Sequence, residues 1–140
     1  MASNGPVRRV ARAEWKGRLD NARAFLTAAD DLMELVESGR SCNPIITQCV
    51  DAAIGYGDAV TIRFGGIVNT VDHHSLGVTL RRAIGARFSA RPAQQLAQIL
   101  AEKEEAAYGA HAATQVEARA VLKVTKRFAE WAEVELARPG

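Results

Sequence analysis

The sequence has few of the residues that build disulfide scaffolds and metal centres. It holds two cysteines, Cys42 and Cys49, with no second cysteine pair and no histidine at the spacing of a zinc site. We therefore expect two reduced thiols and no metal or other cofactor.

Long apolar runs are missing as well. No stretch approaches the roughly 18 apolar residues that cross a bilayer, and residues 1–6 do not resemble a signal peptide. We expect a cytoplasmic protein with no membrane partner.

Several catalytic motifs are also absent. The chain contains no Gly-x-Ser-x-Gly elbow, phosphate-binding loop or dinucleotide-binding glycine fingerprint. Familiar hydrolases and nucleotide kinases are disfavoured, and a catalytic role is not the favoured one.

Aromatic residues make up 6% of the chain while apolar residues reach 48%, much of it alanine. Alanine favours closely packed helices, and 140 residues suit one domain. Apolar residues at steps of three and four predict a long first helix over residues 13–38, with a core-facing seam formed by Trp15, Leu19, Ala22, Leu26, Ala29, Met33 and Val36 and widened by Phe25, Leu32 and Leu35.

Start and stop signals predict the remaining helices. Asn43 and Pro44 begin a helix that ends at residues 65–66, and residues 76–85 form a short one. Pro92 opens a helix that ends near Gly109, and the Thr114 capping box opens the last, over residues 114–136. The fold class we expect is all-α, an antiparallel up-and-down bundle of about five helices over residues 13–137, with no strand and with residues 1–12 as a flexible basic tail.

Two glycines lie inside the second predicted helix. Gly55 and Gly57 each cost about 1 kcal/mol relative to alanine in a helix interior. A compensating contact is expected, either with a closely approaching helix of the same chain or with a second subunit.

The most one-sided charged segment lies between Asp72 and Glu102, where no acidic residue occurs. It holds four arginines that, with Lys103, are candidate phosphate ligands: Arg81, Arg82, Arg87 and Arg91. The alternative is that these arginines pair with acids of the first helix, namely Asp30, Asp31, Glu34 and Glu37.

Asp72, His73 and His74 form a polar cluster that could be joined by His111. Adjacent helical residues point about 100° apart, so the two neighbouring histidines are poorly placed to share one ion. We favour Asp72 as a helix cap with exposed histidines over a metal site.

The segment from Lys103 to Tyr108 and Gly109 carries a family resemblance. Together with the small-sided second helix ending in Gly-Gly, the Asp-His-His loop, and a closing helix with Phe128 and Trp131, it resembles the HEPN (higher eukaryotes and prokaryotes nucleotide-binding) domains over residues 43–136. The resemblance implies a helical bundle, frequently dimeric, linked to nucleotides or RNA. Toxin-type members are commonly encoded beside a nucleotidyltransferase-like antitoxin, so the resemblance also implies such a partner.

Active HEPN members are metal-independent ribonucleases with an arginine followed after four to six residues by a histidine. Here Lys103 and Tyr108 occupy those positions, so both depart from the motif. Tyrosine, with a pKa near 10, is a poor general base at neutral pH.

Three functions follow for the chain. The favoured one is a non-catalytic dimeric bundle that binds nucleotide, RNA or a protein partner. The alternatives are a degenerate ribonuclease using Lys103, Tyr108 and His111, and a self-association module built on Gly55 and Gly57.

Overall fold

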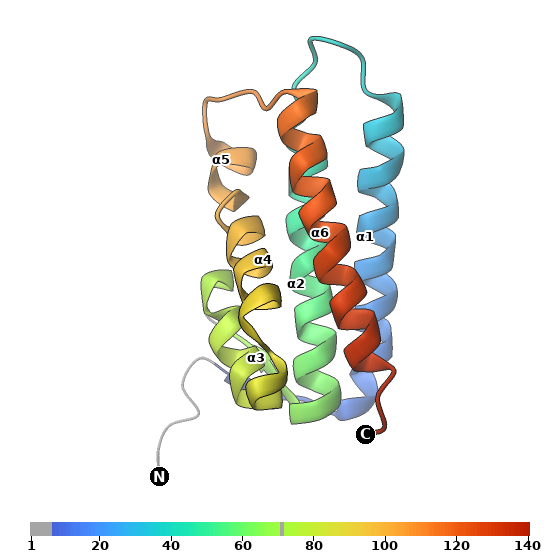
Figure 1. Ribbon diagram of the computed structural model, residues 1–140, viewed down its shortest axis with the longest axis vertical. Coiled ribbons are helices and arrows are strands. Elements are labelled where there is room, and N and C mark those ends of the chain that lie inside the picture. The colour runs from blue at the N-terminus through green and yellow to red at the C-terminus, as the bar shows by residue number, and fades with distance from the viewer. Residues whose placement is uncertain (1–6, 71) are drawn as a thin grey trace.

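The computed structural model describes residues 7–70 and 72–140 and confirms the all-α bundle. Three long helices lie side by side: α1 (Trp15–Leu35), α2 (Asn43–Gly65) and α6 (Gln115–Leu136). In Figure 1, α4 (Ala90–Leu100) and α5 (Lys103–Tyr108) follow one another beside α2 and α6, and α3 (Leu76–Ile84) packs at their lower end. Taken as one column, α4 and α5 give the five-helix arrangement expected.

Helix α2 is the centre of the bundle. Every residue from Tyr56 to Ile62 is buried, which is typical of a helix covered on all sides. It packs against α1, α3, α4, α5 and α6. The small side chains of this helix therefore decide how closely the others approach.

The two helix-interior glycines are explained by contacts within the chain. A Cβ added at Gly55 would lie 2.9 Å from the Cβ of Ala22 on α1, and one at Gly57 would lie 2.7 Å from Cδ2 of Leu76, the first residue of α3. Of the two expected reasons, close helix packing is the one that the structure shows.

A pair of short strands corrects the expectation that the chain has none. Strand β1 (Val7–Arg9) pairs antiparallel with β2 (Ile67–Asn69), so that Arg8 faces Val68. The 3₁₀ turn η1 (Arg12–Glu14) follows, and the Arg12 guanidinium donates to the carbonyls of Arg63 and Phe64 at the end of α2. Residues 7–12 therefore belong to the fold and not to the predicted tail, whose first six residues lie outside the described part.

Two predicted helices differ in extent from the observed ones. Helix α1 ends at Leu35, because Val36 is extended, and Phe25, Leu32 and Leu35 are 38%, 38% and 77% exposed rather than part of the core. The helix predicted from Pro92 to Gly109 is interrupted at residues 101–102, which divide α4 from α5.

The predicted caps have mixed outcomes. Thr114 forms the expected capping box with Glu117. Asn43 does not cap α2; its side-chain amide instead bridges the carbonyl of His111 and the amide of Ala113. Asp72 makes no side-chain cap either and precedes the 3₁₀ turn η2 (His73–Ser75).

The close approach of α1 and α2 predicts opposite effects for two glycine-to-alanine changes. Gly55→Ala should lower the free energy of unfolding by about 1–3 kcal/mol, the usual cost of overpacking. Gly17→Ala on α1 is the matched control, because a Cβ there meets nothing within 4 Å, and it should raise stability by up to about 1 kcal/mol.

Urea unfolding of both variants measures these effects. Combining Gly55→Ala with Ala22→Gly should cost less than the sum of the two single changes, since the second change removes the Cβ atom that the new methyl group would meet at 2.9 Å. A Gly55→Ala variant stabilised as much as Gly17→Ala would contradict the close approach.

Candidate functional site

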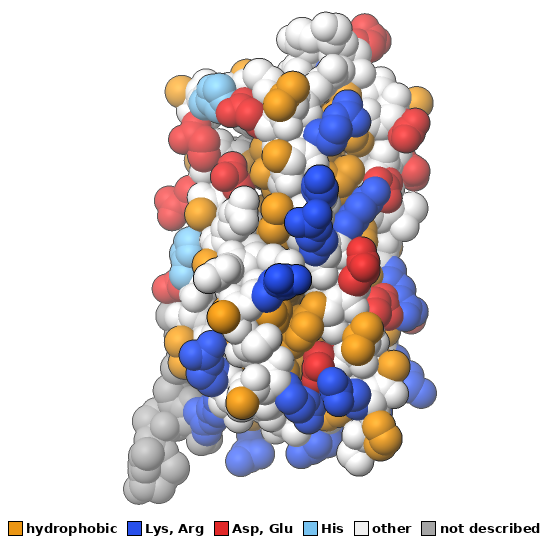
Figure 2. Space-filling view, in the orientation of Figure 1, with side chains coloured by type: hydrophobic (Ala, Val, Ile, Leu, Met, Phe, Trp, Pro, Cys, Tyr) orange, Lys and Arg blue, Asp and Glu red, His pale blue; other side chains and the backbone are white. Residues whose placement is uncertain are grey.

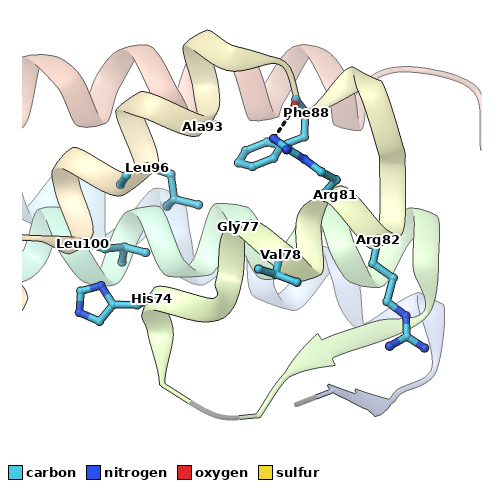
Figure 3. A pocket seen from close by; sticks show the side chains of 10 residues that line it. His74, Gly77, Val78, Arg81, Arg82, Phe88, Ala93, Leu96 and Leu100 are labelled. Carbon is cyan, nitrogen blue, oxygen red and sulfur yellow. Dashed lines mark hydrogen bonds between the residues drawn. The ribbon is translucent and has the colours of Figure 1, made fainter. Parts of the chain in front are cut away.

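A groove of 440 Å³ lies between α3 and α4. Most of its walls are apolar, and its polar side chains stand at the two ends (Figure 3). The lining residues are His74, Gly77, Val78, Arg81, Arg82, Phe88, Ala93, Leu96, Ala97 and Leu100. The volume falls within the range of about 300–1,000 Å³ typical of small-molecule sites.

Local sequence signals shape this groove. Gly85 has a φ of +59° and ends α3, so the chain turns back through the 3₁₀ turn η3 (Gly85–Arg87) toward α4. Phe88 follows that turn and is buried at one end of the groove. Gly77 of α3 faces the Phe88 ring. A Cβ added at Gly77 would lie 3.7 Å from Cε2 of that ring, in van der Waals contact, so the glycine leaves this space open.

The two ends of the groove carry different polar groups. Arg81 lies against Phe88, with its guanidinium 5.7 Å from the ring centroid and Nη2 donating to the Phe88 carbonyl at 3.4 Å. His74 stands at the opposite end, beside Leu100 (Figure 3). The side chain of Arg82 points away from the groove in the same view. The Arg81 guanidinium and the His74 imidazole thus flank an apolar middle.

The other predicted phosphate ligands lie elsewhere. Arg87 pairs with Glu135 at 2.8 Å and lies over the Phe64 ring at 4.6 Å. Arg91 lines a second groove, between α4 and α6. Lys103 begins α5. The five cations predicted to act together therefore do not share one surface, since only Arg81 and Arg82 line the α3–α4 groove.

The alternative explanation of the arginines is wrong for Arg81, Arg87 and Arg91. Within residues 7–70 and 72–140, none of these three forms an ion pair with α1. Asp30 of α1 pairs instead with Lys126 of α6 at 2.6 Å.

The predicted ribonuclease residues do not converge. Tyr108 is 87% exposed. His111 pairs with Glu117 at 2.9 Å, and this hydrogen bond raises the pKa of the imidazole. Lys103 instead lies near enough to Asp51 of α2 and His73 of η2 for its charge to lower the pKa of both. The sequence reasoning missed Asp51, although a carboxylate inside the apolar start of a helix was a usable signal.

The Asp51–His73–Lys103 cluster has perturbed acid–base properties. Burial and the Lys103 charge lower the pKa of His73, whose Nδ1 atom is buried without a hydrogen-bond partner within the described residues. Burial also raises the pKa of Asp51, against the influence of His73 and Lys103. The His73 ring is therefore held mainly neutral at pH 7.

Two further properties bear on the site. Among the described residues, no group of three His, Cys, Asp or Glu side chains is arranged to hold a metal ion. In the same part of the chain, no helix has the length and apolar character needed to span a bilayer.

Opposite shifts of the His73 pKa are predicted for the two charged neighbours. Lys103→Gln should raise it, because a nearby cation disfavours the imidazolium ion, and Asp51→Asn should lower it. Proton NMR titration of the imidazole signals measures both shifts. His111 is an internal control whose pKa should stay unchanged, and equal His73 titration in all three proteins would contradict the cluster.

Comparisons with known proteins add no relative to this description. No protein-family model matches the chain, and a search of curated proteins finds no match. The function is therefore argued from the groove and its charged neighbours.

Proposed function

We propose that this protein is a non-catalytic, HEPN-like helical bundle that binds a nucleotide in the groove between α3 and α4. The observation that carries the proposal is the combination, in one 440 Å³ groove, of an apolar middle with a guanidinium at its end. A nucleotide has the same division, with a flat base at one end and anionic phosphates at the other.

Each part of the groove suits one part of that ligand. The walls formed by Val78, Leu96 and Leu100 would cover the base, which gains from leaving water. Arg81 would bind the phosphates, because guanidinium groups form paired, charge-assisted hydrogen bonds with phosphate oxygens. The Phe88 ring and carbonyl already orient Arg81, which reduces the entropy lost on binding.

Association with a second copy, or with a nucleotidyltransferase-like protein, belongs to the same proposal. Its support is the exposed apolar side chains of α1, namely Phe25, Leu32 and Leu35. They lie outside the nucleotide groove, and exposed apolar patches commonly mark protein contacts. Gly55 and Gly57 are not part of this surface, since they serve packing inside the chain.

Nucleotide titration by calorimetry tests the proposal. We expect ATP to bind more tightly than AMP and adenosine to bind weakest, because phosphate contacts add to base burial. Arg81→Gln should weaken ATP binding about tenfold, corresponding to about 1.4 kcal/mol. The variant should change adenosine binding little.

Arg40→Gln is the control, since Arg40 lies in the loop between α1 and α2 at the opposite end of the bundle (Figure 1). It removes the same charge and should leave ATP affinity unchanged. RNA incubated with the protein in EDTA should stay intact. Absence of ATP binding, or equal losses in the two variants, would refute the proposed site.

A further inference from the structure

A second groove, of 720 Å³, runs between α4 and α6 and is lined mainly by polar side chains. Helix α4 contributes Arg91 and three glutamines, Gln94, Gln95 and Gln98, and α6 contributes Arg127. Glu130 is the single carboxylate among its described lining residues. The composition differs from that of the α3–α4 groove, so the two sides of α4 present different chemistry.

The helix stability rules do not explain the cations at this groove. Arg91 lies in the first turn of α4, where the helix dipole disfavours a positive charge. Within the described residues, neither Arg91 nor Arg127 forms an ion pair. A cation placed unfavourably and left without a carboxylate partner is available to an external anion.

The exposed side of α6 continues the positive charge. Between Glu117 and Glu130 this helix has four basic residues and no acidic one. Arg119, Lys123 and Arg127 follow at steps of four, an arrangement in which like charges repel and destabilise a helix. Arg127 lines the α4–α6 groove, whereas Arg119 and Lys123 line a hollow between α1 and α6 together with Asp30 and Glu34. Figure 2 shows Lys and Arg side chains descending over α6, while Asp and Glu collect toward the upper left and the right edge of this face.

The basic part of the groove ends near Gln98, at the end away from Arg91. Gln98 also lines the adjoining hollow higher between the same helices, where Glu102 and Glu117 supply negative charge. The basic part therefore extends from Arg91 to Gln98, eight residues of α4 that span about 10 Å along its axis. This length suits a few linked phosphates and not a long polyanion.

We propose that the α4–α6 groove binds the backbone of a single-stranded nucleic acid through Arg91 and Arg127, which line it from its two helices. The concave position of the two arginines favours a flexible strand over a rigid duplex. The three glutamine amides can donate to and accept from unpaired base edges. This inference does not depend on nucleotide binding in the α3–α4 groove.

The probe is a fluorescein-labelled 12-nucleotide oligouridylate, followed by anisotropy between 25 and 200 mM salt. Two to three neutralised phosphates predict a plot of log K against log salt with a slope of about −1.4 to −2.1. Arg91→Gln/Arg127→Gln should weaken binding at low salt about tenfold or more. It should also reduce the magnitude of the slope by about 1.4, since each lost phosphate contact contributes about 0.7.

Arg40→Gln/Lys126→Gln is the charge-matched control. It removes two cations outside the groove, one of which already pairs with Asp30, and should keep nearly all of the affinity. Circular dichroism checks that both double variants remain folded. Equal losses in the two variants would overturn the proposal, because net charge alone would then explain binding.

Three further outcomes would also overturn it: no binding at 25 mM salt, equal affinity for a duplex of the same length, or equally effective competition by polyglutamate. Arg91→Gln/Arg127→Gln should bind ATP as the unmodified protein does. Arg81→Gln should bind oligouridylate normally, so that failure at one groove is distinguishable from failure at the other.

Discussion

The close contact of α2 with its neighbours is the constraint on which the rest of the structure depends. With no side chain at Gly55, α1 approaches until Ala22 lies against the α2 backbone, and Arg18 of α1 reaches Asp58 of α2 at 3.2 Å. With no side chain at Gly57, Leu76 packs directly on α2 and fixes the start of α3. The helical penalty of two glycines is offset by burial on both sides of the central helix.

The placement of α3 in turn determines the groove between α3 and α4. Leu76 holds the beginning of α3 against α2, Gly85 ends the helix nine residues later, and the chain returns as α4. The groove is the space left between these two helices, with Phe88 at the turn. Its shape therefore follows from packing at Gly57 and not from any motif at the groove itself.

Helix α4 separates two surfaces of different chemistry. One side faces an apolar groove with Arg81 at its end, and the other faces a polar groove with Arg91 and Arg127. The acid-free segment from residue 73 to 101 supplies cations to both. We infer that its charge bias serves two anion sites, whereas the sequence suggested one.

Features set by neighbouring residues could be predicted, and features set by distant contacts could not. The Thr114 capping box and the buried seam of Leu19, Ala22, Ala29 and Met33 follow from local spacing. The pairing of Val7–Arg9 with Ile67–Asn69 joins segments about sixty residues apart and carries no local signal. The exposure of Phe25 and Leu32 depends on which side of α1 packs against other helices, and that is set by tertiary contacts.

The candidate site was predictable only in part, for the same reason. The sequence located the basic segment but not which of its arginines face which groove. Arg87, for example, forms an ion pair with Glu135, which lies 48 residues away along the chain. The Lys103 charge comes within electrostatic reach of Asp51 and His73 only because α5 packs on α2.

The central claim, nucleotide binding between α3 and α4, is tested most directly by methyl NMR during an ATP titration. We predict saturable shifts of the Val78, Leu96 and Leu100 methyl signals, which line the groove, while Val116 and Val134 on the exposed surface of α6 stay unchanged. Shifts confined to Val116 and Val134, or no shift at saturating ATP, would contradict the account.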